Sequence, residues 1–143
     1  MRRLRALAPL VAAALVVTAS CARADTLHVL RLSLMSEYRY QTLDRDVRDP
    51  EGVARFARII AGLPAVDPGR YFCPIDFGLR YRLDLRGGAL PVLSATAEAG
   101  GCRFLELPLG EFRATTDEFW DELAALVGMG RDELLLRPQR AVP

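Results

Sequence analysis

Lysine and asparagine are absent from this chain, and histidine and tryptophan each occur once. Because asparagine is absent, the protein carries no N-linked glycan. Its 19 basic residues, all arginine, stand against 18 acids, so the net charge is only +1. A nucleic-acid-binding surface needs a basic excess, and we therefore expect no nucleic-acid partner. Alanine, glycine, proline and arginine are all encoded by GC-rich codons, and their abundance indicates a GC-rich bacterial genome.

The scarcity of histidine restricts the chemistry of the chain. A histidine-based triad would depend on His28 alone, and no base–nucleophile pair surrounds it in the sequence. We interpret His28 as an ordinary strand residue. One histidine and two cysteines that we expect to be oxidised supply no zinc ligands at a recognised spacing. The sequence thus predicts neither a metal nor another cofactor.

The apolar run near the N-terminus is too short to span a bilayer. Residues 6–17 number about twelve, whereas a transmembrane helix needs roughly 20. The run follows the basic segment Met1-Arg2-Arg3-Leu4-Arg5 and precedes Ala22-Arg23-Ala24, which is the order of a signal peptide. We predict that residues 1–24 are removed, and that residues 25–143 form one secreted, periplasmic or envelope domain with a short frayed C-terminal tail.

A different cleavage site is also present. The segment Thr18-Ala19-Ser20-Cys21 resembles a bacterial lipobox, in which Cys21 is acylated and becomes the N-terminus. A lipobox usually carries leucine where Thr18 stands. Cleavage after Ala24 instead discards Cys21 and four arginines, which leaves 15 arginines against 18 acids, a net charge of about −3.

Two cysteines remain in the predicted domain, Cys73 and Cys102. An even number of cysteines in an exported domain predicts one disulfide, and the alternative is two buried thiols. The bond would close a loop of roughly 30 residues and stabilise the domain by about 3–4 kcal/mol in the chain-entropy model.

The sequence patterns predict an α+β fold. Apolar residues alternate from Leu27 to about residue 41, with Leu30 and Leu32 on the buried side and Arg31 on the polar side, which predicts one strand or a hairpin broken near Ser36. After a polar turn over residues 44–49, Asp49 and Pro50 predict the start of a helix that ends near residue 62.

Three further strands and a second helix follow. The strands are expected over residues 79–86, 90–97 and 102–107, joined by Gly-Gly turns, and the helix over residues 116–127. The predicted order is β(β)-α-β-β-β-α, an antiparallel sheet of four to five strands with two helices on one face. In such a meander Cys73 lies in the loop that crosses the end of the sheet toward Cys102.

A segment around Cys73 carries a resemblance. Residues 71–78, Tyr-Phe-Cys-Pro-Ile-Asp-Phe-Gly, are followed by Tyr81-Arg82-Leu83 and later by Gly101-Cys102. This pattern resembles uncharacterised small exported proteins of GC-rich bacteria that share a CPxDxGxxYxL segment and a later Gly-Cys. The resemblance covers roughly residues 49–107. It implies export and the disulfide, and it transfers no activity and no site.

Two other motifs have structural interpretations. Asp76-Phe77-Gly78 matches a kinase tripeptide, but the other kinase motifs are absent, so we interpret it as a turn. Asp44, Asp46, Asp49 and Glu51 form an acidic cluster, yet Arg48 and Asp49 stand where a calcium loop needs an oxygen ligand and glycine. We interpret this cluster as a solvated turn and a helix cap.

Arg80, Arg82 and Arg86 share one face of a predicted strand, with Arg31 and Arg39 expected beside them. If helices cover the other face, these arginines form a candidate binding surface for an acidic protein or an anionic envelope polymer. Alternatively, they form a solvated face paired with acids such as Asp84 and Glu37.

Three functions follow from these observations. We favour a small exported binding or interaction module without catalytic machinery. The first alternative is an extracytoplasmic hydrolase that uses carboxylates such as Asp76, Asp84 and Glu106. The second is a structural envelope lipoprotein anchored through Cys21.

The predicted cleavage site gives a first test. We expect the intact mass of the exported protein to correspond to a chain that begins at Asp25, because Ala22-Arg23-Ala24 fits the signal peptidase pattern. A mature protein that begins at an acylated Cys21 would contradict this prediction and place the domain on a membrane surface.

Overall fold

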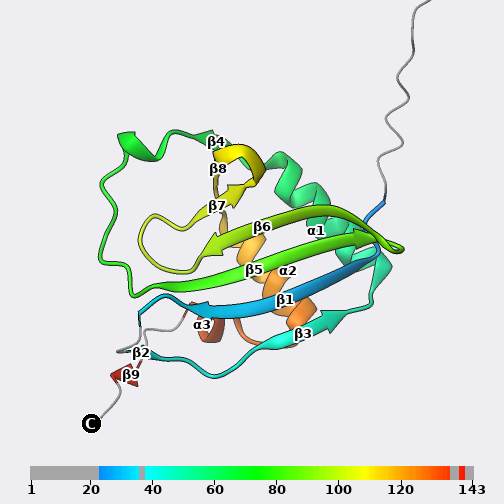
Figure 1. Ribbon diagram of the computed structural model, residues 1–143, viewed down its shortest axis with the longest axis horizontal. Helices are drawn as coiled ribbons and strands as arrows, with labels where there is room; N and C mark the ends of the chain where they lie inside the picture. The colour runs from blue at the N-terminus through cyan, green and yellow to red at the C-terminus, as the bar shows by residue number, and fades with distance from the viewer. Residues whose placement is uncertain (1–22, 36–37, 136–138, 141–143) are drawn as a thin grey trace, which may run out of the picture.

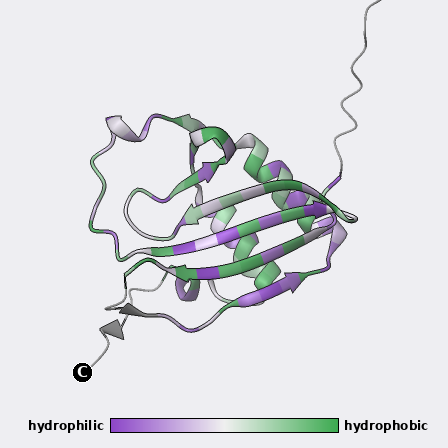
Figure 2. Ribbon diagram, viewed as in Figure 1, coloured by the Kyte–Doolittle hydropathy of each residue, from purple (hydrophilic) through white to green (hydrophobic). Residues whose placement is uncertain are grey.

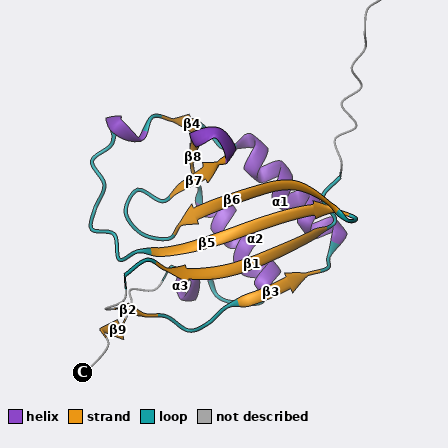
Figure 3. Cartoon of the chain, viewed as in Figure 1, coloured by secondary structure: helices purple, strands orange, loops and turns teal. Residues whose placement is uncertain are grey.

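A computed structural model describes residues 23–35, 38–135 and 139–140 of the chain. Cys21, the predicted signal peptide up to residue 22, and Glu37 lie outside these residues. The described chain forms a seven-stranded antiparallel sheet with helices packed on one face (Figures 1 and 3). The strands of this sheet, in spatial order, are β3 (Asp44–Val47), β1 (Thr26–Ser33), β5 (Leu79–Gly87), β6 (Leu90–Glu98), β7 (Phe104–Leu107), β8 (Glu111–Ala114) and β4 (Ala65–Val66).

The helices lie behind the sheet in Figure 1. They are α1 (Pro50–Gly62), α2 (Asp117–Val127) and the short α3 (Arg131–Leu134). Two 3-10 turns, η1 (Pro68–Arg70) and η2 (Pro108–Gly110), and a separate two-stranded pair, β2 (Tyr38–Arg39) with β9 (Gln139–Arg140), complete the described elements. The α+β class, the antiparallel sheet and the central meander β5-β6-β7 are confirmed.

The predicted number of strands was too low, and α3 is a third helix where two were predicted. The missed strands lie at or near the two edges of the sheet and are only two or four residues long. Strand β3 was interpreted as a polar turn because three of its four residues are charged and only Val47 is buried. Charged, short edge strands give little hydrophobic alternation, although they protect a sheet edge from further pairing.

Both predicted helices have the expected caps. The Asp49 carboxylate accepts a hydrogen bond from the Gly52 backbone N–H at 3.1 Å, and Pro50 occupies the first turn. The Thr116 hydroxyl accepts from the Phe119 N–H at 3.2 Å, and α2 ends at Gly128, whose φ of 66° is the left-handed conformation that glycine tolerates.

The core lies between the helices and the sheet. Strand β5 contributes every second residue, so that Tyr81 and Leu83 are fully buried while Arg82 and Arg86 are exposed. Phe56 of α1 and Phe119 and Trp120 of α2 pack behind it, with the Phe56 and Phe119 ring centroids 5.1 Å apart. Figure 2 shows the resulting alternation of hydrophilic and hydrophobic residues along β5.

The predicted orientation of β1 was wrong. Its buried side chains are Leu27 and Val29, so Leu30 and Leu32 lie on the other face and Arg31 lies on the helix side. There the Arg31 Nε donates to the Tyr81 hydroxyl at 3.0 Å, and the guanidinium lies over the Tyr81 ring at 5.4 Å. The contacts with Tyr81 allow an arginine to occupy a position next to the core.

The disulfide between Cys73 and Cys102 is present, with the two Cα atoms 4.8 Å apart. Cys102 lies just before β7, and Cys73 lies in the loop between η1 and β5 that crosses the end of the sheet (Figure 1). The bond therefore holds a loop with little regular structure against the turn between β6 and β7.

Removal of this bond gives a test of the fold. We expect the double substitution Cys73→Ala with Cys102→Ala to lower the free energy of unfolding by about 2–4 kcal/mol, because the unfolded chain gains the entropy of an open loop. The midpoint of urea denaturation measures this loss. An unchanged midpoint, or two titratable thiols in the exported wild-type protein, would contradict the prediction.

Candidate functional site: the open face of the sheet

The face of the sheet opposite α1 and α2 carries no helix of the described chain, and we call it the open face (Figure 1). Neighbouring strands of a sheet lie about 4.8 Å apart, so side chains aligned across strands can interact. The register aligns three rows on this face, which are Thr26-Arg86, Asp46-His28-Asp84-Ser94 and Asp44-Leu30-Arg82-Thr96.

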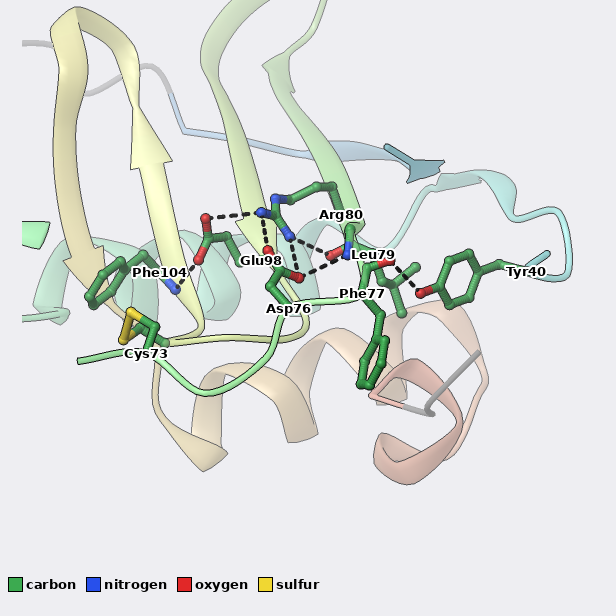
Figure 4. Close-up of polar contacts among 10 residues, drawn as sticks. Tyr40, Cys73, Asp76, Phe77, Leu79, Arg80, Glu98 and Phe104 are labelled. Carbon is green, nitrogen blue, oxygen red and sulfur yellow. Dashed lines mark hydrogen bonds and ion pairs between the residues drawn. A yellow bond between two sulfur atoms is a disulfide. The ribbon is translucent and has the colours of Figure 1, made fainter. Parts of the chain in front are cut away.

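Arg80, on the same face, is engaged by two carboxylates. Its guanidinium donates two hydrogen bonds to Asp76, at 2.5 and 3.1 Å, and lies 3.3 Å from Glu98 (Figure 4). The side chain is only 13% exposed. These contacts connect the disulfide-bonded loop to β5 and β6, so Arg80 supports the fold and is not available to a ligand.

The two carboxylates around Arg80 have opposite pKa shifts. The hydrogen bond from Arg80 lowers the pKa of Asp76 below its usual value and outweighs the effect of burial. Burial raises the pKa of Glu98 even though Arg80 and the Phe104 backbone N–H both favour its charged form. We conclude that Asp76 is the principal partner of Arg80.

Arg82 and Arg86 differ from Arg80. Arg82 is 55% exposed and pairs with Asp84 at 3.1 Å, and Asp84 also accepts a short hydrogen bond from Ser94. Burial alone would raise the pKa of Asp84, but the Ser94 hydrogen bond and the charge of Arg82 lower it below its usual value. Within the described chain, the Arg86 side chain has no hydrogen bond or ion pair.

Arg86 lines a hollow of about 380 Å³ on the open face, which we call the basic hollow. Its lining residues are Thr26, His28, Asp46, Arg48, Arg86 and Gly88. Arg48 is exposed and, like Arg86, its guanidinium has no hydrogen bond or ion pair to any residue that the structure describes. Arg48 and Arg86, which have no hydrogen bond or ion pair within the described chain, therefore line one hollow.

A second hollow of about 290 Å³ lies along the same face. Arg82 and Thr96 line it together with Leu32, Glu106 and Pro108. The open face thus offers a basic position at one end and a mixed position in its middle. An extended ligand could contact both.

Two depressions elsewhere are less suited to a charged ligand. The groove between α1 and α2 is lined by Arg55 and Glu122, which pair with each other at 3.2 Å. A cavity of about 200 Å³ near the disulfide is lined by apolar side chains and by Arg103 at its rim. This volume is below the 300–1,000 Å³ or so that is typical of small-molecule sites.

The carboxylates of the predicted hydrolase are separated by the fold. Asp76 binds Arg80, whereas Asp84 lies in the row of His28. The hollow that Glu106 lines contains neither of them. The lowered pKa values of Asp76 and Asp84 are the opposite of what a general acid needs.

The acidic cluster between Asp44 and Glu51 is likewise divided. Asp49 caps α1, Asp44 lies against His28, and Asp46 faces the basic hollow. Among the described residues, no three His, Cys, Asp or Glu side chains gather as metal ligands.

Comparisons with known proteins add no homologue. No family model, curated protein or solved structure matches this chain. The resemblance to small exported proteins with a CPxDxGxxYxL segment therefore stays a prediction. No helix in the described part of the chain is long and apolar enough to cross a membrane.

Sequence reasoning placed Arg86 on the candidate surface but missed Arg48, which lines the same hollow. Arg48 was assigned to a turn, and Arg31 was expected beside the three arginines of β5, but it lies on the opposite face. The signal for Arg48 was available: Val47 is the single apolar residue of a short strand, which places its neighbours Asp46 and Arg48 on the other side.

The pKa shifts around Arg80 give a pH-dependent test. At neutral pH, Asp76→Asn should lower the free energy of unfolding by about 1–3 kcal/mol through loss of charge-assisted hydrogen bonds. A carboxyl whose folded pKa is lowered stabilises the protein above its unfolded value of 3.8, so the loss should shrink as pH falls below that value.

Glu98→Gln is the matched control for this test. Because the folded pKa of Glu98 is raised, its contribution to stability is complete below the unfolded value of 4.5 and is lost as pH rises through the folded value. The stability of wild type relative to Glu98→Gln should therefore decrease from low to neutral pH. Urea denaturation across this pH range measures the unfolding free energy of each variant relative to wild type. If these differences changed with pH in the same direction for both variants, the opposite pKa shifts assigned to Asp76 and Glu98 would be contradicted.

Proposed function

We propose that this protein is an exported, non-catalytic binding module whose open face holds an anionic ligand at the basic hollow. The observation that carries the proposal is that Arg48 and Arg86, both exposed and neither paired with a carboxylate of the described chain, line one hollow. Arginine is suited to bidentate recognition of carboxylate, phosphate and sulfate groups.

The arrangement of these two arginines fits a single anionic group. Arg86 pairs with Thr26 across β5 and β1, and Arg48 follows β3 directly, so the two arginines come to the hollow from opposite sides of β1. Thr26 lines the same hollow, and its hydroxyl is a further hydrogen-bond donor. Asp46 at the edge of the hollow disfavours a second negative group close by.

The shape of the open face favours a polymer over a compact ion. The second hollow continues along the same face, with Arg82 as its exposed cation. An envelope polymer with anionic groups spaced along its chain would contact both positions, and its affinity would sum over weak contacts. An acidic segment of a protein is the other partner with this chemistry.

Export is supported by the N-terminal pattern and by the disulfide, which is typical of oxidising compartments. Ala24, the last residue of the predicted signal peptide, is buried in the core, and regular pairing begins just after it. The backbone N–H of Asp25 donates to the Arg86 carbonyl at 2.8 Å, and β1 begins at the next residue.

Anion binding can be tested with inorganic sulfate as the probe. We expect Arg48→Ala and Arg86→Ala each to weaken sulfate binding about two- to fivefold, the magnitude of one exposed charge pair. Amide chemical shifts of Thr26 and Gly88, followed during a sulfate titration at constant ionic strength, measure the affinity.

Arg58→Ala is the matched control, because Arg58 is an exposed arginine of α1 on the opposite side of the sheet. It should leave sulfate binding unchanged. Equal losses in all three variants would indicate non-specific charge attraction, and no shift in the wild type would refute the proposal. A pull-down from the native envelope then distinguishes a polymer from an acidic protein.

A further inference from the structure

His28 lies in the lining of the basic hollow, between two carboxylates of neighbouring strands. Its Nε2 is 2.8 Å from Asp44 Oδ1, and its Nδ1 is 3.8 Å from Asp84 Oδ2. An ionised carboxylate only accepts hydrogen bonds, so the hydrogen of the neutral ring belongs on Nε2. The lone pair of Nδ1 then faces Asp84, and only the protonated ring presents a donor in both directions.

The charges around the ring are balanced when His28 is neutral. Three arginines face this region from β5 and from the end of β3, and three aspartates face it from the same two strands. They are Arg48, Arg82 and Arg86, and Asp44, Asp46 and Asp84. Because these six charges cancel, proton uptake by His28 turns a locally neutral surface into one with a single positive charge.

We infer that proton uptake by His28 adds a positive charge to the lining of the basic hollow, so that the protein binds divalent oxyanions such as sulfate or phosphate esters more tightly in acidic surroundings and releases them in alkaline ones. This inference rests on the proposed anion site. Histidine is the side chain whose charge ordinarily changes between about pH 5 and pH 8. By linkage, a bound anion favours proton uptake at His28 to the same extent.

The experiment is a sulfate titration of the wild-type protein and of His28→Gln at about pH 5 and about pH 7, a range in which the α-amino group of a chain that begins at Asp25 stays largely protonated. Sulfate is chosen because its own charge does not change over this range, unlike that of phosphate. We expect the wild type to bind roughly three- to tenfold more tightly at the lower pH, as one added charge near a dianion in water would give. His28→Gln should bind with the same affinity at both.

Asp44→Asn provides a readout that a purely structural role would not change. Without the Asp44 carboxylate at Nε2, the protonated ring loses its nearest counter-charge, so the midpoint of the pH response should differ from that of the wild type. NMR titration of the His28 ring, with and without sulfate, measures this midpoint and its coupling to the anion.

The outcomes separate the two proposals. If the wild type binds sulfate equally at both pH values while Arg48→Ala weakens binding, the role of His28 is refuted and the anion site stands. If no sulfate binds at either pH, the anion site itself is refuted. A pH response that persists in His28→Gln would also overturn the inference, because it would assign the titration to another group.

Discussion

The structure depends on the burial of one face of strand β5 against α1 and α2. Leu79, Tyr81, Leu83 and Leu85 are each at most 4% exposed, and this strand lies between β1 and β6 in the sheet. Because side chains alternate along a strand, full burial of these four positions forces the intervening charged residues onto the opposite face. The charged open face is therefore a direct consequence of the way the core is packed.

Strong local patterns allowed much of the fold to be predicted. The caps of α1 and α2, the alternation of β5 and the Gly-Gly turn are each specified within a few residues, and the structure agrees with them. The disulfide could be predicted because two of the three cysteines, Cys73 and Cys102, lie in the predicted mature domain. The edge strands could not, because β4 has two residues and β3 has one buried side chain, which is too little for a period-two pattern.

The candidate site was harder to predict because it depends on which strands are neighbours. The alternation of leucines in β1 suggested Leu30 and Leu32 as core residues. Leu27 and Val29 also alternate with period two, on the opposite face of the strand, and that face is the one that is buried. Only the pairing of β1 with both β3 and β5 brings Arg48, His28 and Arg86 to one hollow. Likewise, sequence spacing gave no sign that Asp76 and Glu98 would both engage Arg80.

The two edges of the sheet limit how copies of this protein can associate. At one edge, β3 presents Asp44, Arg45 and Asp46 in succession, and at the other, β4 offers only two residues for pairing. Sheets grow into fibrils by adding strands to long, flat, uncharged edges, and neither edge here has that form. Copies of the protein at high concentration would therefore not pair through their sheet edges, which leaves the open face as the sheet surface available to other molecules.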